Sequence, residues 1–191
     1  MSDICITDLC KTYDGKPVLR DFSAVLPAGQ ITGLMAPSGA GKTTLLRILM
    51  GLEKPDSGRI DGLDGMRMSV VFQEDRLCNN LDAVSNIRLV TSGLGREQAT
   101  DALAAVGLSG CIGQPACELS GGMRRRVALL RALLAEYDVL LLDEPFKGLD
   151  RDTRARVMAD TRARCAGRTV LLVTHDSGEL DAMGVTRRLT L

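Results

Sequence analysis

The sequence contains no tryptophan, and aromatic residues make up only 3% of its 191 residues. Hydrophobic residues still amount to 45%, so a core must be built from aliphatic side chains. They come in short clusters, and none approaches the roughly 20 apolar residues that span a bilayer. The first eleven residues lack a basic start followed by an apolar run, so we expect no signal peptide. These absences favour one aliphatic-core domain that works at a membrane only by docking there.

The sequence also lacks an excess of either charge, since 24 Lys and Arg residues balance 24 Asp and Glu residues. This balance argues against a protein whose main task is to coat nucleic acid. There is one histidine, and no two of the six cysteines have Cys-x-x-Cys spacing, which excludes the common Cys/His zinc patterns. We expect free thiols in a reducing compartment.

Short apolar runs separated by turns predict an α/β fold. The runs Val139–Leu142 and Val170–Val173 are too short for typical helices and are typical of buried parallel strands. A helical pattern between them, Arg151–Cys165, completes a β-α-β unit. A further helix is expected over Lys42–Met50, and other strands are expected at Val18–Leu26, Ile31–Met35 and Ser69–Phe72. Alternating apolar residues at Ile4, Ile6 and Leu9 predict an edge strand at the N-terminus.

The stretch from about Arg76 to Ala135 has a mainly helical pattern. Within its last helix, Val127, Leu130 and Leu134 share one apolar face. We predict one domain over residues 1–191, with a parallel sheet core and an antiparallel β part near the N-terminus. A helical subdomain is expected to be inserted at approximately residues 76–135.

A glycine-rich segment, Ala36–Thr43, lies between an expected strand and an expected helix. It matches the phosphate-binding pattern G-x-x-x-x-G-K-[ST], except that Ala36 stands in place of the first glycine. Glycines let backbone N–H groups approach phosphate oxygens, and the following helix adds its positive N-terminal end. Lys42 is then expected to neutralise the β- and γ-phosphates, and Thr43 to bind Mg²⁺. The residues expected to bind nucleotide here are Ser38, Gly39, Ala40, Gly41, Lys42, Thr43 and Thr44.

Two carboxylates, Asp143 and Glu144, directly follow the run Val139–Leu142. Ligands of α/β sheets bind at the carboxyl ends of the parallel strands. Asp143 is therefore expected to hold Mg²⁺, mainly through water, and Glu144 to activate the attacking water. Many strands end in an acid, so the pair indicates a nucleotide site only together with the glycine-rich segment.

The segment Leu119–Met123 reads Leu-Ser-Gly-Gly-Met and differs from the ABC signature Leu-Ser-Gly-Gly-Gln only at Met123. With the two preceding motifs, the chain resembles the ATP-binding domains of ABC transporters over almost its whole length. Ser120 also has the position of a helix N-cap, and the two interpretations agree because a capped helix end binds anions. The resemblance implies that Ser120, Gly121 and Gly122 bind the γ-phosphate.

Four further residues are assigned by their position in this family pattern. Tyr13 corresponds to the aromatic residue that stacks on adenine, and Gln73 to the catalytic glutamine that links Mg²⁺ and water to the permease contact. Asp150 belongs to a Gly-Leu-Asp segment that resembles the D-loop, which communicates between subunits. His175 corresponds to the switch histidine that touches the γ-phosphate. Each residue alone would more often be structural, so these assignments rest on the resemblance.

The resemblance also implies partners. Two subunits face head to tail, so that ATP and Mg²⁺ lie between the glycine-rich loop of one subunit and the signature of the other. Hydrolysis is expected to power a separately encoded integral membrane permease, with a solute-binding protein as a further partner. The ATPase would sit peripherally at the cytoplasmic face of the cell membrane. Residues 51–58, 71–77 and 142–150 are similar to nitrate, sulfonate and taurine importer subunits.

Two features leave alternatives open. The run Arg124–Arg126 would suit nucleic acid, but no aromatic residues interleave it, so we interpret it as a solvated helix face. The segment after Gln73 either docks on the permease or belongs to the core through Leu77, Leu81, Val84 and Ile87.

A soluble non-transport ABC ATPase acting as an ATP-switched interaction module is the main alternative function. Its relatives usually carry two cassettes or a long coiled-coil insertion, and neither is visible in this sequence. A P-loop kinase is disfavoured by the signature.

Overall fold

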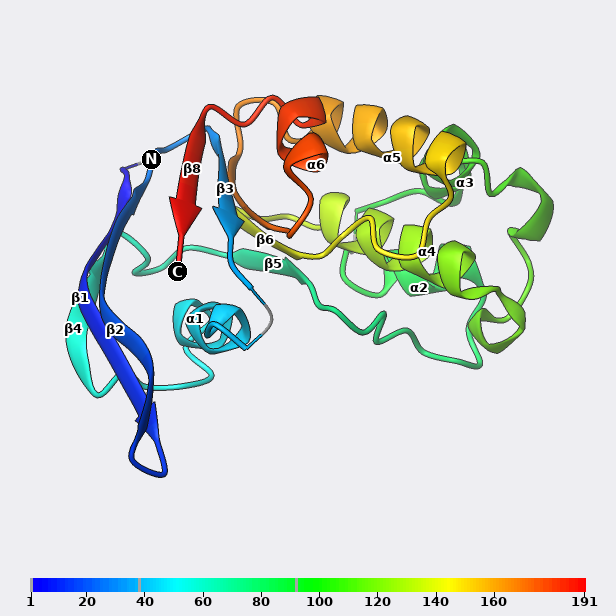
Figure 1. The fold of residues 1–191 in the computed structure, drawn as a ribbon. Coiled ribbons are helices and arrows are strands. Elements are labelled where there is room, and N and C mark those ends of the chain that lie inside the picture. Colours follow the sequence, from blue (N-terminus) through cyan, green and yellow to red (C-terminus); the bar gives the residue numbers. More distant parts are fainter. Residues whose placement is uncertain (1, 38, 92) are drawn as a thin grey trace.

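The computed structural model describes residues 2–37, 39–91 and 93–191, and they form two sheets with helices around them (Figure 1). The larger sheet has the strand order β5-β6-β7-β3-β8, and every neighbouring pair in it is parallel. Its strands are β3 (Ile31–Met35), β5 (Met68–Val71), β6 (Val139–Asp143), β7 (Thr169–Val173) and β8 (Arg187–Thr190). The predicted parallel α/β core is confirmed.

The two apolar runs predicted as buried strands are β6 and β7, and they feed two hydrophobic clusters. Leu140 and Leu142 face one cluster, whereas Val139 and Leu141 face the other. Successive side chains of a strand point to opposite faces, so a continuous apolar run is what a sheet covered on both faces requires. Helix α5 (Arg151–Arg164) connects the two strands, as the β-α-β pattern predicted.

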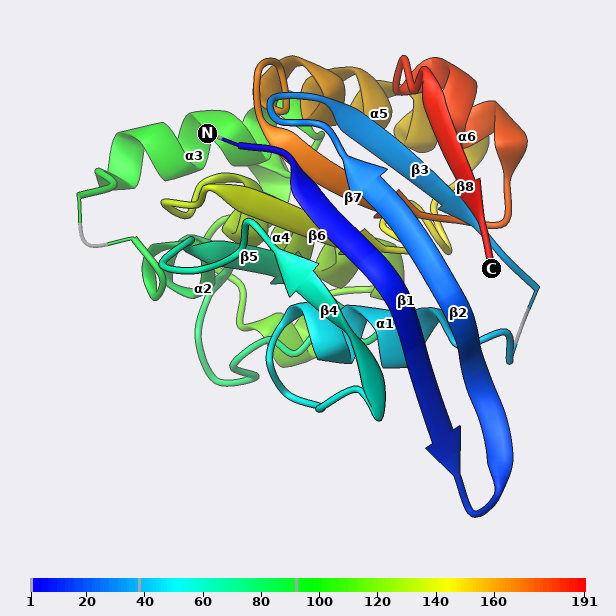
Figure 2. The same ribbon diagram turned by 90° about the vertical axis from the view of Figure 1, so that its left-hand side faces the viewer.

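The smaller sheet is antiparallel, has the order β2-β1-β4, and covers one face of the parallel sheet together with α1 (Figure 2). Its strands are β1 (Ile4–Tyr13), β2 (Lys16–Leu26) and β4 (Ser57–Asp61). The prediction of an edge strand at the N-terminus is wrong, because β1 lies between β2 and β4. Alternating side chains reveal a strand's buried face, whereas its neighbours depend on segments far away in the sequence.

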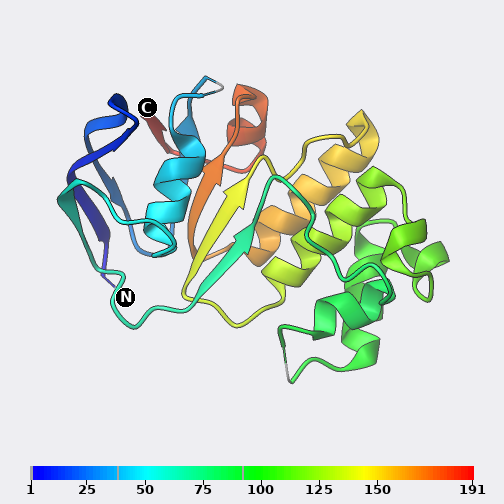
Figure 3. The same ribbon diagram turned by 90° about the horizontal axis from the view of Figure 1, so that it is seen from below.

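Helix α1 (Lys42–Leu49) lies between the antiparallel sheet and the parallel sheet, and most of the other helices lie on the opposite face (Figure 3). Besides α5, these helices are α2 (Ala83–Arg88), α3 (Arg96–Ala105), α4 (Gly121–Leu133) and α6 (Ser177–Ala182). Short 3₁₀ turns lie at Ser109–Cys111 and Ala116–Glu118. The helices between β5 and β6 share one hydrophobic cluster with the sheet. The antiparallel sheet and the helices thus flank the parallel strands from two sides.

The segment after Gln73 contributes to this cluster. Leu77, Val84 and Ile87 are buried there. These three residues therefore belong to the core, which was one of the two alternatives for this segment. Among residues 2–37, 39–91 and 93–191, no helix has the length and apolar character needed to cross a membrane.

Candidate functional site

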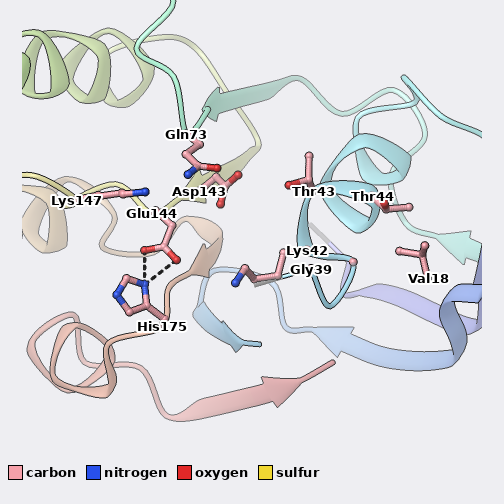
Figure 4. A pocket seen from close by; sticks show the side chains of 11 residues that line it. Val18, Gly39, Lys42, Thr43, Thr44, Gln73, Asp143, Glu144, Lys147 and His175 are labelled. Carbon is pink, nitrogen blue, oxygen red and sulfur yellow. Dashed lines mark hydrogen bonds and ion pairs between the residues drawn. The ribbon is translucent and has the colours of Figure 1, made fainter. Parts of the chain in front are cut away.

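Four neighbouring parallel strands end at one edge of the sheet, and their following loops carry most of the predicted residues. An open cleft of about 420 Å³ lies there (Figure 4). The predicted residues that line it are Gly39, Gly41, Lys42, Thr43, Thr44, Gln73, Asp143, Glu144 and His175. They follow β3, β5, β6 and β7, so the topology brings together segments up to 136 residues apart, from Gly39 to His175. This is the edge at which open α/β sheets bind ligands.

The glycine-rich loop joins β3 to α1, and it has glycines where the backbone takes a positive φ. Gly41 has φ 96°, and a Cβ atom there would lie 2.8 Å from the Val18 carbonyl oxygen. Gly39 has φ 82°. Ala36 is buried and does not have a positive φ, so the departure from the usual first glycine strains no backbone. Lys42 opens α1, and its Nζ donates hydrogen bonds to the Ala36 and Pro37 carbonyls at 2.6 and 3.2 Å.

The two carboxylates lie at the end of β6. Asp143 is only 7% exposed, and burial together with the nearby Glu144 carboxylate raises the pKa of its carboxyl. Glu144 has φ 48°, a left-handed conformation that is uncommon for residues other than glycine. Its N–H donates to the Val173 carbonyl at 2.9 Å, which anchors it to the next strand. Such backbone strain is concentrated at functional sites.

His175 contacts Glu144 from the loop after β7. Its Nδ1 lies 2.9 and 2.8 Å from the two Glu144 carboxylate oxygens (Figure 4). Because a carboxylate accepts hydrogen bonds, Nδ1 carries the proton and donates. The hydrogen bond and the charge of Glu144 raise the pKa of His175. The arrangement links the predicted general base to the predicted switch residue.

The cleft offers oxygen ligands for a divalent cation. Thr43 lies across the cleft from Asp143 and Gln73 (Figure 4). Hydroxyl, amide and carboxylate oxygens suit Mg²⁺, which usually takes one or two carboxylates and completes its shell with water and phosphate oxygens. In the described part of the chain, no three His, Cys, Asp or Glu residues cluster as metal ligands. A cation would also favour the charged form of Asp143, whose pKa is raised by burial and by the nearby Glu144 carboxylate.

Several predicted residues lie outside this cleft. Tyr13 ends β1, is 39% exposed and has Lys11 Nζ 5.3 Å from its ring centroid. Ala40 lines a neighbouring hollow beside Val18, Gly121 and Gly122 line a third hollow, and Ser38 is outside the described residues.

Two of the remaining residues cap helices. Ser120 accepts a hydrogen bond from the Met123 N–H at 3.3 Å and begins α4, as the N-cap prediction required. Asp150 accepts from the Thr153 N–H at 3.0 Å and begins α5. The capping contacts explain the local turns, and the nucleotide roles of both residues stay predictions.

The interpretation of Arg124–Arg126 as a solvated helix face is wrong. Arg125 is 4% exposed, and Arg124 and Arg126 are half-buried. Arg124 donates to the Ala116 carbonyl at 2.9 Å, and Arg126 donates to the Val106 carbonyl at 2.8 Å. These side chains are held because loops around α4 present backbone carbonyls, which charge counting along the sequence does not reveal.

Sequence reasoning missed three residues in or behind the cleft. Val18 and Lys147 line it, and Arg125 packs behind its carboxylates. The position of Lys147, three residues after Glu144, was a signal in the sequence for that residue. Val18 and Arg125 reach the site only through the pairing of distant segments.

Comparison with known proteins places these features in a family. The model of the family described as ABC transporter matches residues 19–147. The chain is 43% identical to the aliphatic sulfonates import ATP-binding protein SsuB 1 of Rhodococcus jostii, over 94% of this chain and 79% of that relative. It is 40% identical to SsuB 3 of Pseudomonas savastanoi pv. phaseolicola, over 98% of this chain and 72% of that relative. It is 39% identical to the Fe(3+) ions import ATP-binding protein FbpC 1 of Rhizobium meliloti, and spans 57% of that protein.

Proposed function

This chain belongs to the ABC transporter family of ATP-binding subunits, and on that premise we propose that the cleft at the sheet edge is its site of ATP hydrolysis. The chain is an ATPase whose turnover powers import through a separate membrane permease. The observation that carries the site assignment is the convergence of Lys42, Asp143, Glu144 and His175, from three distant segments, on one cleft.

Each group has a role that follows from its position. The loop with Gly39 and Gly41 presents backbone N–H groups to the phosphates, and the Lys42 ammonium neutralises their charge. Thr43, Gln73 and Asp143 would hold Mg²⁺, which neutralises phosphate charge when bound. Glu144 accepts a proton from the attacking water.

His175 orients the Glu144 carboxylate through Nδ1. Only one ring nitrogen is used in that contact, so the opposite side of the ring can meet the γ-phosphate. Tyr13, Ala40, Thr44 and Ser38 complete the proposed nucleotide contacts, with Tyr13 stacking on adenine.

We assign Ser120, Gly121 and Gly122 to the nucleotide bound by a second subunit. Gly121 and Gly122 lack a positive φ, and a Cβ atom would have no described neighbour within 4 Å at Gly121 and only ordinary contacts at Gly122. Alanine would therefore fit this chain and would favour the helix by about 1 kcal/mol. The glycines serve instead the close approach of a phosphate group. We also assign Asp150 to the contact between the two subunits.

The relatives of this chain differ in the solute that their names specify. Their names specify aliphatic sulfonates and Fe(3+) ions at nearly equal identities of 43% and 39%. We infer that the solute is selected by the permease and a solute-binding protein, and that this chain works peripherally at the cytoplasmic face of the membrane.

The test is MgATP hydrolysis by the purified chain and two variants. Glu144→Gln should bind MgATP but turn over about 100- to 1,000-fold more slowly, because the amide keeps the shape and loses the base. Lys42→Ala should lose nucleotide affinity, measured by titration calorimetry, whereas the exposed Lys54→Ala should match the wild type. A wild type that hydrolyses no faster than Glu144→Gln would reject the assignment.

A further inference from the structure

The strongest unexplained feature of the molecule is a buried arginine directly behind the cleft. Arg125 lies on α4 and is 4% exposed. Its Nη1 donates to the Phe72 carbonyl at 2.5 Å and the Gln73 carbonyl at 3.4 Å. On its other side, Nη2 and Nε donate to the carbonyls of Asp143 at 2.7 Å, Glu144 at 2.6 Å and Pro145 at 3.1 Å. One guanidinium therefore joins the backbone after β5 to the backbone after β6.

This contact is specific to the shape and charge of arginine. A buried charge is costly unless it is paired and fully hydrogen-bonded, and the hydrophobic cluster to which α4 contributes is mainly aliphatic. The guanidinium presents five N–H donors in a fixed plane, which lets it serve two segments at once. The Asp75 carboxylate, at 3.4 Å from Nη1, supplies a counter-charge. A residue that only filled space here would not need these properties.

On the β6 side, Arg125 stabilises an unusual backbone. Glu144 has φ 48°, and three successive carbonyls, from Asp143 to Pro145, all accept from the same guanidinium. That convergence needs the left-handed turn at Glu144, which a non-glycine residue adopts only when its surroundings impose it. The Val173 carbonyl of the neighbouring strand β7 accepts a hydrogen bond from the Glu144 N–H. Arg125 therefore helps to fix the direction in which the Glu144 side chain leaves the backbone.

On the β5 side, Arg125 holds the start of a loop. Strand β5 ends at Val71, so the Phe72 and Gln73 carbonyls lie beyond the sheet ladder. A second arginine of α4, Arg131, donates to the Asp75 and Arg76 carbonyls at 3.3 and 2.9 Å. Arg131 makes no hydrogen bond to Asp143, Glu144 or Pro145 in the described structure. Among the described residues, Arg125 alone joins the two segments by side-chain hydrogen bonds.

We propose that Arg125 is a positioning residue that fixes Gln73 relative to Glu144 and thereby sets the rate of ATP hydrolysis, with little effect on nucleotide affinity. The proposal rests on the proposed function of the cleft. One bridged segment carries Gln73, which the family resemblance links to both Mg²⁺ and water, and the other carries Glu144, the proposed base. The phosphate-binding loop and α1 make no hydrogen bond with Arg125 in the described structure. Loss of the bridge should therefore disturb chemistry more than binding.

The experiment compares wild type, Arg125→Met, Arg125→Lys and Arg131→Met. Single-turnover hydrolysis gives the rate of the chemical step, titration calorimetry gives the Kd for MgATP, and thermal unfolding shows that each variant is folded. A misplacement of about 1 Å can lower a rate about 100-fold, and we expect that loss for Arg125→Met with little change in Kd. Arg125→Lys keeps the charge without the planar fork, so its hydrolysis rate should lie between those of wild type and Arg125→Met. Arg131 joins the same helix to the loop after β5 without reaching the segment after β6, so Arg131→Met should keep nearly the wild-type rate.

Three outcomes would overturn the proposal: a folded Arg125→Met with wild-type rate, a loss of affinity that accounts for the whole loss of activity, or an equal rate loss in Arg131→Met. If Arg125→Met does not fold, Arg125→Lys decides, because a folded lysine variant with the wild-type rate also contradicts the bridge. Failure of the proposed function looks different, since the wild type itself would then show no MgATP hydrolysis above Glu144→Gln.

Discussion

At the scale of single residues, the glycine-rich loop depends on backbone conformation more than on the consensus letters. Gly39 and Gly41 have positive φ, whereas Ala36, at the position of the usual first glycine, does not. The Ala36 carbonyl accepts a hydrogen bond from Lys42 Nζ, and any residue at this position could supply that carbonyl. The departure at Ala36 should therefore be tolerated, and the strict requirement should lie at Gly41.

Two substitutions in this loop test that requirement. Gly41→Ala places a Cβ atom 2.8 Å from the Val18 carbonyl at a left-handed φ. The conformation alone costs about 1–2 kcal/mol, so we expect a lower melting temperature and loss of measurable ATP binding. Ala36→Gly should cost only about 0.5–1 kcal/mol through the entropy of the unfolded chain and should leave kcat/KM nearly unchanged. A Gly41→Ala variant that binds ATP normally would contradict this account.

At the scale of elements, the turn before α2 is organised by one buried asparagine. Asn86 is fully buried, and its Oδ1 accepts from the Cys78 N–H at 2.8 Å. Its Nδ2 lies 3.0–3.1 Å from the carbonyls of Cys78, Leu81 and Asp82. One amide thus holds the irregular segment that leads from the Gln73 loop into the helices.

Asn86→Ala should destabilise the fold by about 2–3 kcal/mol, because it leaves buried backbone groups without partners. Urea denaturation measures this loss. Asn80→Ala, at an exposed position in the same segment, should stay within about 0.5 kcal/mol of wild type. Equal effects of the two substitutions would show that the hydrogen bonds of Asn86 do not stabilise the segment. Affinity for ATP should change little in either variant, because neither residue lines the cleft.

At the scale of the whole molecule, the question is whether one subunit contains a complete site. The cleft with Lys42 and Glu144 does not include Ser120, which caps α4 beside a different hollow. We therefore expect the α4 end to act on ATP held by a second subunit. ATP binding and dimerisation would then stabilise each other by mass action.

Mixing two inactive variants tests this shared site. Ser120→Arg and Lys42→Ala should each be inactive alone, because each homodimer lacks one half of both sites. In a 1:1 mixture about half of the dimers are mixed and hold one intact site, so up to about a quarter of wild-type activity should return. A mixture that stays inactive although mixed dimers form would refute the shared site. So would wild-type hydrolysis that is independent of protein concentration across the dimerisation range.

The parallel core and most of the cleft could be predicted from the sequence alone. Apolar runs reveal strands buried on both faces, and motifs such as Ala36–Thr43 and Asp143-Glu144 follow strand ends that must meet at one edge. These signals are local, because they depend on the period of a single element and on the residues that directly follow it.

Three features depend on long-range contacts of the folded chain: the place of β1 between two strands, the presence of Val18 in the cleft and the burial of Arg125. Strand neighbours and buried hydrogen bonds join segments that are distant in the sequence, such as Arg125 and Phe72, 53 residues apart. Arg124, Arg125 and Arg126 are equivalent in a count of charges. They differ in which backbone carbonyls the folded chain places within reach of each guanidinium, and the free energy of burying a charge depends on those partners.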